Sequence, residues 1–209
     1  MKTIGLALLF GLMAAPGKIV TFDNDPLGKA PPGWSVVAVN GVAAPQWEVR
    51  RDQTGPTQSR VLALAPPAAD ASRSALTLLN SVSLRDGDVS VRVKSVGGSH
   101  VQAGGVVFRY RDANNYYLAR ADALQQNVAL FKVENGRSIP VGQAVRHDLP
   151  ANAWRILKVS ARGSDIQIYL DHRRILQAKD GAFTGSGKVG LWAAGDSVTY
   201  FDDFRVDPK

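Results

Sequence analysis

The chain has 209 residues, contains no cysteine and carries a formal net charge of +7 at pH 7. The lack of cysteine excludes disulfides, a thiol nucleophile and a cysteine-ligated zinc site. The length and apolar content suit one all-β domain with a substantial core. The basic residues are scattered and form no recognised nucleic-acid motif, so we expect a solvated surface and no nucleic-acid partner. An anionic polysaccharide stays open as a partner.

The N-terminus contains an apolar run, Ile4–Ala15. It is too short to span a bilayer and has the length of a signal-peptide core. Ala15 and Gly17 fit the small-residue rule for cleavage after Gly17, so we expect a signal peptide over 1–17 and a periplasmic or secreted protein. The alternative is a buried N-terminal strand or helix. No other stretch could cross a membrane, and the mature chain, 18–209, would begin on a strand.

Strand patterns recur at short intervals, with turn residues between them. Val89–Val93 alternates strictly, which is typical of a half-buried strand. Asn135-Gly136 accepts the positive φ of a type I′ turn and predicts a hairpin. Prolines interrupt residues 43–72, and 68–74 is expected to be one helical turn or a loop. Further strands are predicted over 104–111, 116–120, 127–133, 154–161, 165–170 and 174–178.

The C-terminal run contains two β-rich segments, Gly187–Trp192 and Ser197–Val206, on either side of a short turn. A terminal strand needs partners already in place, so the chain is expected to close as one unit of sheet on sheet. The pattern as a whole predicts an antiparallel β-sandwich of jelly-roll type, formed by a single domain over 18–209.

Several strings together resemble the concanavalin A-like lectin/glucanase superfamily, particularly its laminin G-like and 3-keto-disaccharide hydrolase branches in bacterial secreted proteins. The resemblance covers nearly the whole mature chain and is strongest from Gly104 onward. It implies a jelly-roll fold and a function in carbohydrate recognition, although fold alone does not set chemistry. The strings are Phe22–Pro26, Pro32–Trp34, Phe108–Asp112, Asn115–Ala121, Asn127-Val128, Asn135-Gly136, Trp154, Tyr169–Asp171 and the C-terminal run.

Three aspartates suggest a metal site where the first and last strands meet. Asp23 ends the opening strand, and Asp202 and Asp203 lie in the last one. Calcium takes several hard oxygen ligands, which nearby backbone carbonyls could complete. The resemblance implies a structural calcium near this position, whereas strand alternation sends Asp202 and Asp203 to opposite faces. The alternative is that these carboxylates cap turns or pair with basic residues.

A binding face is predicted where neighbouring strands present arginines and a tyrosine. If Phe108 and Tyr117 point into the core, alternation sends Arg109, Tyr116 and Arg120 outward, with Asn127 on the next strand. An aromatic ring stacks on a sugar, and guanidinium and amide groups hydrogen-bond its hydroxyls. The alternative is a solvated face with cross-strand pairs. Trp154 and Trp192 are expected in the core.

Catalytic patterns are weak in this chain. The only glutamates are Glu48 and Glu134, and no strand carries two carboxylates at alternate positions facing a cleft. Glycoside hydrolysis normally needs two carboxyls across one bond. We therefore expect a carbohydrate-binding, lectin-like module that recognises a glycan on a concave sheet face. The alternatives are a hydrolase of keto-sugar glycosides, implied by the resemblance alone, and an envelope protein-interaction domain.

Overall fold

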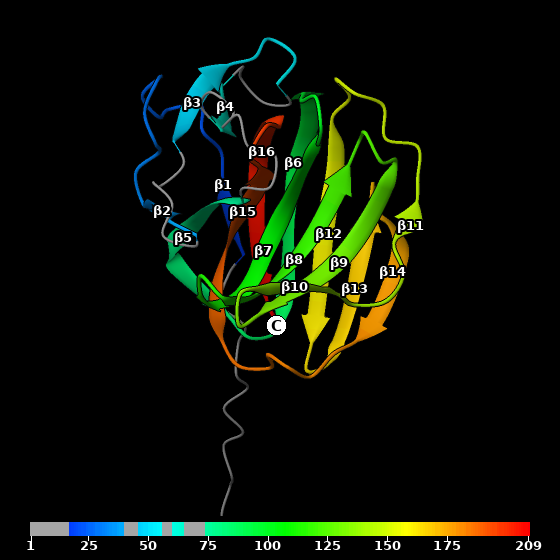
Figure 1. Ribbon diagram of the computed structural model, residues 1–209. Coiled ribbons are helices and arrows are strands. Elements are labelled where there is room, and N and C mark those ends of the chain that lie inside the picture. The colour runs from blue at the N-terminus through cyan, green and yellow to red at the C-terminus, as the bar shows by residue number, and fades with distance from the viewer. Residues whose placement is uncertain (1–16, 40–45, 56–59, 65–73) are drawn as a thin grey trace, which may run out of the picture.

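The computed structural model of the chain describes residues 17–39, 46–55, 60–64 and 74–209. Two sheets of antiparallel ladders pack face to face in this part (Figure 1). Sheet A contains β1 (Lys18–Val20), β3 (Trp47–Arg51), β4 (Arg60–Leu64), β6 (Gly87–Gly97), β12 (Arg155–Arg162), β13 (Asp165–Leu170), β14 (Arg173–Lys179) and β16 (Val198–Pro208). Sheet B contains β2 (Trp34–Val37), β5 (Ser74–Leu84), β7 (Ala103–Asp112), β8 (Asn115–Asp122), β9 (Asn127–Glu134), β10 (Arg137–Pro140), β11 (Val145–Arg146) and β15 (Gly187–Ala194).

The strand order confirms the predicted all-β sandwich of jelly-roll type. Sheet A runs β14-β13-β12-β6-β16-β4-β3, and β1 pairs with β16. Sheet B runs β10-β9-β8-β7-β15-β5-β2, and β11 pairs with β9. The first and last strands therefore lie side by side, with Lys18 opposite Val206. β15 and β16 each lie inside a sheet, so the C-terminal run joins both halves of the fold.

The local turn and strand predictions agree with these elements. Asn135 and Gly136 have φ values of 51° and 77°, as a type I′ turn between β9 and β10 requires. Residues 1–16 of the expected signal peptide and 68–73 of the expected helical turn lie outside the described residues. No helix long and apolar enough to cross a membrane occurs in the described part of the chain.

The main core fills the space between the sheets. Val89, Val91 and Val93 on β6 face this core at alternate positions, as their spacing predicts. Aromatic rings join the first and last parts of the chain, because Trp34 packs edge-on against Phe204 at a centroid distance of 5.2 Å. This contact fixes β16 against sheet B.

A second buried apolar cluster lies on the other face of sheet B. Leu191 and Ala193 belong to the main core, whereas Trp192 between them belongs to the second cluster. Trp192 is therefore buried in a core cluster as predicted, on the outer face of sheet B, whereas Trp154 is only half-buried. Its neighbours in the cluster include Leu76, Leu78, Val107 and Leu118.

Candidate functional site

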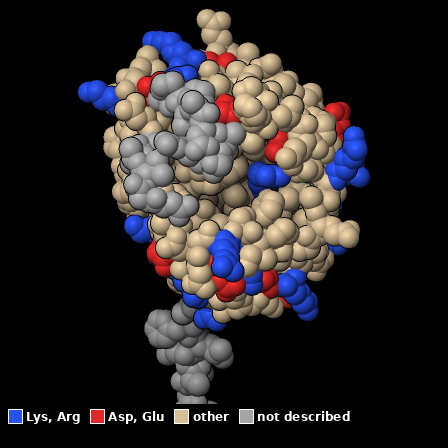
Figure 2. All heavy atoms as spheres, viewed as in Figure 1, with Lys and Arg blue, Asp and Glu red and all other residues tan. Residues whose placement is uncertain are grey.

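On the outer face of sheet B, a tryptophan and an arginine lie on either side of a glycine. Trp192 on β15 lies opposite Gly105 on β7, and Gly105 lies opposite Arg120 on β8. Directly opposite residues share a face, so an indole and a guanidinium stand on either side of a position with no side chain. Figure 2 shows this surface hollowed over β7 and β8, with a basic side chain beside the hollow. We call the group Trp192, Gly105, Arg120 and Asp122 the sheet B hollow.

Arg120 is held in place by polar and aromatic neighbours. Its Nη2 donates to Oε1 of Gln125 at 3.0 Å and lies 3.8 Å from Oδ2 of Asp122. Its guanidinium lies over the Phe131 ring, 5.0 Å from the centroid. Burial lowers the pKa of Arg120, while the charge of Asp122 opposes that shift. The contacts with Gln125, Asp122 and Phe131 give the guanidinium a fixed orientation.

Three polar atoms in the hollow are buried without a hydrogen-bond partner in the described part of the chain. They are Nε of Arg120, Oδ2 of Asp122 and Nε1 of Trp192. Buried polar atoms in folded proteins nearly always have a partner, which can be an ordered water or a ligand. These three atoms are closed off from solvent, so a polar molecule reaches this group through the partly exposed side chains of Arg120 and Asn127. The donors and the acceptor of these two side chains suit hydroxyl groups, which both donate and accept.

Two of the predicted contact residues come together at this site. Nη2 of Arg120 lies 3.5 Å from Oδ1 of Asn127, and Nδ2 of Asn127 donates to Oε1 of Gln125 at 3.3 Å. Both side chains keep some exposure to solvent. The structure therefore brings Arg120 and Asn127 together on one face, and their role in binding stays a prediction.

Tyr116 lies on the same face but cannot stack on a ligand. It is 2 % exposed and packs against Tyr110 at a centroid distance of 5.9 Å. Burial raises the pKa of Tyr116 to about 12. The expected stacking role was wrong because Tyr116 belongs to the second apolar cluster. The ring of Phe131, which is partly exposed, is the aromatic surface nearest Arg120.

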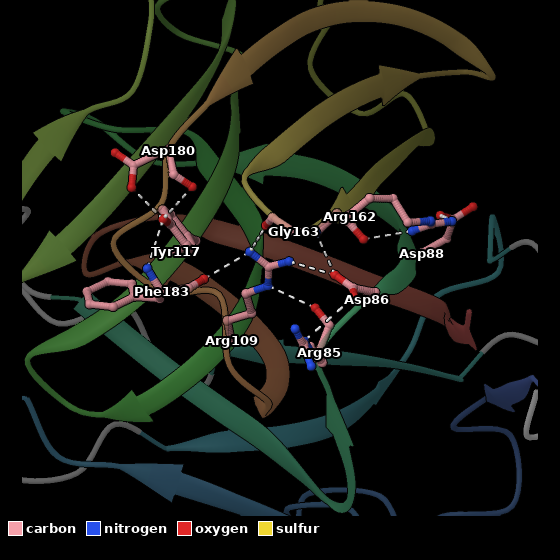
Figure 3. Close-up of polar contacts among 10 residues, drawn as sticks. Arg85, Asp86, Asp88, Arg109, Tyr117, Arg162, Gly163, Asp180 and Phe183 are labelled. Carbon is pink, nitrogen blue, oxygen red and sulfur yellow. Dashed lines mark hydrogen bonds and ion pairs between the residues drawn. The ribbon is translucent and has the colours of Figure 1, made fainter.

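Arg109 is not on the binding face, and that prediction was also wrong. The β7–β8 register shifts after Phe108, and Arg109 has a φ of 48°, so a bulge interrupts the alternation. Its side chain is 1 % exposed. The guanidinium donates to the carbonyls of Arg85, Gly163 and Phe183 at 2.7–2.9 Å and to Oδ1 of Asp86 at 3.1 Å (Figure 3). Arg109 thus ties three chain connections together inside the sandwich.

A second polar group lies beside Arg109 in Figure 3. The Tyr117 hydroxyl donates to Oδ1 of Asp180 at 2.5 Å and accepts from the Phe183 N–H at 3.2 Å. Nζ of Lys132 lies 3.3 Å from Oδ2 of Asp180. Because every one of these groups is paired, we regard the cluster as a structural tie for the 180–183 segment and not as a ligand site.

The three aspartates expected to hold calcium do not form a ligand set. Asp203 pairs with Arg92, whose Nε donates to Oδ2 at 2.8 Å, and Oδ1 of Asp202 accepts from the backbone N–H of Asp203. A register shift follows Asp202 and Asp203 has a φ of 48°, so simple alternation fails here too. Residues 17–39, 46–55, 60–64 and 74–209 contain no group of three His, Asp or Glu side chains placed to hold a metal. Calcium binding through Asp23, Asp202 and Asp203 stays an untested prediction that these contacts do not favour.

The sequence-based prediction missed several residues of the hollow. Gly105 follows Gly104 in a strand, and a strand glycine can mark a close approach of ligand or backbone. That signal was available, whereas the position of Trp192 opposite Gly105 depends on a register between strands 87 positions apart in sequence. Asp122 and Gln125 belong to the β8–β9 turn, where the Asp122 Oδ1 accepts from the N–H groups of Leu124 and Gln125.

These features define a concanavalin A-like jelly roll with a polar hollow on an outer sheet face. The chain has the fold of the concanavalin A-like lectin/glucanase superfamily, in agreement with the resemblance of its sequence. A β-glucanase from Bacillus licheniformis shares this fold over 88% of the chain and 96% of its own length, with a TM-score of 0.58 and 13% identity. A laminarinase from Rhodothermus marinus matches 93% of the chain and 96% of its own length, with a TM-score of 0.58 and 9% identity.

Two proteins of Bacillus subtilis are similar in sequence as well. The carbohydrate binding module CBM66 matches 86% of the chain and 99% of its own length, with a TM-score of 0.65 and 25% identity. A levanase of strain 168 is 34% identical over 115 residues, which is 54% of this chain. The match spans only 17% of the levanase. No family model matches the chain.

Proposed function

We propose that this protein is a carbohydrate-binding module that holds a glycan in the sheet B hollow. The observation that carries the proposal is the similarity to a carbohydrate binding module along nearly the full length of that module. The predicted recognition of a glycan on a sheet face agrees with it. Of the predicted contact residues, Arg120 and Asn127 stay in the proposed site and Arg109 and Tyr116 leave it. Trp192 and Asp122 are themselves buried and support Arg120 from its side.

The chemistry of the hollow supports sugar binding. The partly exposed guanidinium of Arg120 is a donor, and the amide of Asn127 beside it both donates and accepts. The exposed edge of Phe131 offers an apolar surface to the C–H groups of a sugar ring. Two lines of directly opposite residues cross the site, Trp192-Gly105-Arg120-Ala129 and Ala103-Asp122-Asn127. Asp122 is the only carboxylate among these described residues. Because glycoside hydrolysis normally needs two carboxyls, we favour binding over hydrolysis.

The similarity to a levanase selects the first polysaccharide to test. We propose levan as a ligand. We also propose that the protein works outside the cytoplasm, because a polysaccharide ligand would be encountered outside the cell. The expected signal peptide over 1–17 points the same way. Neutral and anionic polysaccharides of other types serve as comparisons, because the net charge of +7 leaves an anionic glycan open.

Affinity gel electrophoresis with polysaccharides cast in the gel tests the proposal. We expect levan to slow migration of the protein, and free saccharide from the same source to reverse the effect. Retardation by a different polysaccharide would keep the binding function and change the ligand. Unchanged migration in every neutral and anionic polysaccharide would contradict the proposed function.

A further inference from the structure

A row of polar residues continues from the sheet B hollow toward the edge of the sheet. Asp122 on β8 lies opposite Asn127 on β9, and Asn127 lies opposite Arg146 on β11. Directly opposite residues on antiparallel strands point to the same side. Asp122 also shares that side with Arg120, two residues earlier on β8. The outer face of sheet B is therefore polar along a line that crosses three strands.

This line ends in a groove that the proposed glycan site does not use. Gln126, Arg146, His147 and Asp148 line it, and its volume is about 260 Å³. This volume is slightly below the roughly 300 Å³ at which small-molecule sites begin, so the groove could take at most a small group such as one sugar ring. We call these four residues the Arg146 groove.

The backbone of the Arg146 groove is fixed by Gln126. Its Nε2 donates to the carbonyls of Ala123 and Leu149, and its Oε1 accepts from the Leu149 N–H at 2.9 Å. The N–H of His147 donates to the Gln126 carbonyl at 3.0 Å. These bonds place residues 146–148 without using the side chains of Arg146 or Asp148. A preformed site loses less conformational entropy when a ligand binds.

Two of the side chains that line the groove, Arg146 and Asp148, have no polar partner in the described part of the chain. Neither the guanidinium of Arg146 nor the carboxylate of Asp148 makes an ion pair or a hydrogen bond with another described residue. His147 uses Nδ1 on the Asp148 carbonyl, which leaves Nε2 available. A donor and an acceptor of opposite charge side by side suit neutral hydroxyl groups better than a strongly anionic group, which Asp148 would repel.

We propose that the Arg146 groove is a second saccharide contact, so that the protein recognises an oligosaccharide or chain end longer than one sugar. The ligand runs across β8, β9 and β11, with one residue in the sheet B hollow and a later one in the Arg146 groove. Asn127 lies between the two and contacts the linking part. This inference rests on the proposed function and adds the length and direction of the bound glycan.

Isothermal titration calorimetry with levan-derived saccharides of increasing length tests the inference. We expect the affinity of the unmodified protein to rise about tenfold from the shortest saccharide that binds to those a few residues longer. In Arg146→Ala and Asp148→Ala the longer saccharides should bind about five- to tenfold more weakly, and the shortest should bind as before. Arg137→Ala, at an exposed position of β10, is the matched control and should leave every affinity unchanged.

The outcomes separate this inference from the function on which it rests. Affinity that does not depend on saccharide length, with Arg146→Ala and Asp148→Ala equal to the unmodified protein, would overturn the second contact and keep the glycan-binding function. If levan does not slow the protein but another polysaccharide does, saccharides from that polysaccharide replace the levan series. A failure of every saccharide to bind would instead overturn the proposed function.

Discussion

Arg120 and Trp192 flank Gly105 across three neighbouring strands of sheet B, and both carry a buried nitrogen without a hydrogen-bond partner in the described residues. The strands β15, β7 and β8 are far apart in sequence and adjacent in the sheet. The side chain of Arg120 is 19% exposed, so it is the part of this arrangement that a hydroxylated ligand can contact. The relationship places the centre of the proposed site.

Arg120→Ala should weaken glycan binding more than any other single change on this face. Truncation removes the guanidinium and leaves Asp122 without its nearest cation, which lies 3.8 Å away. Central, largely desolvated arginines dominate many interfaces, so we expect a loss of about 10- to 100-fold in affinity. Isothermal titration calorimetry with levan measures it.

Arg120→Lys distinguishes the contribution of the positive charge to glycan binding from the contribution of the planar guanidinium. Lysine keeps the charge but loses the planar fork and its contact with the Phe131 ring, so affinity should recover only partly. Arg137→Ala is again the control for removing a positive charge. Full recovery by lysine would show that charge alone matters, and equal binding by Arg120→Ala would remove Arg120 from the site.

Gly105→Ala should destabilise the fold. A Cβ at this position would collide with the carbonyl oxygen of Ala119 and lie 2.8 Å from Cδ1 of Leu118. Overpacking of this kind costs about 1–3 kcal/mol in the free energy of unfolding. Gly181→Ala is the matched control, since a Cβ there meets no atom within 4 Å. Urea unfolding of both variants checks the difference, and equal stabilities would contradict the close packing of Gly105.

Strand alternation predicted the orientation of β8 correctly. Tyr117, Ala119 and Ala121 face the main core, and Tyr116 and Leu118 belong to the outer cluster. The same rule failed on β7 after Phe108, because the bulge at Arg109 changes the phase and sends Tyr110 to the outer face. A bulge depends on contacts with distant segments, here the carbonyls of Arg85 and Gly163, and leaves little trace in the local pattern.

Only some residues of the sheet B hollow could be predicted from the sequence, because the others meet through pairing between distant strands. Arg120 and Asn127 lie on consecutive strands, so their proximity follows from one hairpin. Trp192 and Gly105 become neighbours only through the order β8-β7-β15 in sheet B. Sequence alternation assigns a residue to a face, but the register between distant strands decides which residues on that face meet.

Removal of calcium should leave the stability of the protein unchanged. The carboxylate of Asp203, one of the expected ligands, pairs with Arg92 at 2.8 Å. We therefore expect the same melting temperature in the presence of a chelator and in the presence of added calcium. An ion that binds only the folded state raises stability with its concentration. A melting temperature several degrees higher with calcium would contradict this expectation and restore the predicted site.

Acid should destabilise the fold through Asp180. Burial acts to raise the pKa of this carboxyl, but hydrogen bonds from the Tyr117 hydroxyl and the Ala182 N–H, together with Lys132, hold it below its usual value of 3.8. A pKa lower in the folded state means that the stabilisation is present above the unfolded pKa. It is lost as the pH falls through the folded pKa.

The free energy of unfolding should therefore decline below about pH 4, and Asp180→Asn should decline less over the same range. The variant should also be less stable than the unmodified protein at neutral pH, because Lys132 loses its ion pair with Asp180 and keeps only the one with Glu134. Urea titrations at a series of pH values measure both effects. Asp165→Asn, which removes a more exposed carboxylate, is the control. Parallel pH curves for Asp180→Asn and the unmodified protein would contradict the role of Asp180.

Arg109 should be the arginine whose loss costs the fold most. Its guanidinium, buried among three carbonyls and Asp86, makes four hydrogen bonds, and no water can replace it without rearrangement. Breaking a buried, fully paired charge costs about 3–5 kcal/mol. We expect Arg109→Met to lower the free energy of unfolding by that amount, measured in urea.

Arg109→Lys should recover little of this loss, because an ammonium group cannot reach the carbonyls of Arg85, Gly163 and Phe183 from one position. Arg137→Ala, a change at an exposed arginine, should stay within about 0.5 kcal/mol of the unmodified protein. The folded fraction of Arg109→Met should still bind levan, since Arg109 does not line the sheet B hollow. A stability loss below about 1 kcal/mol in Arg109→Met would show that the three connections do not depend on this side chain.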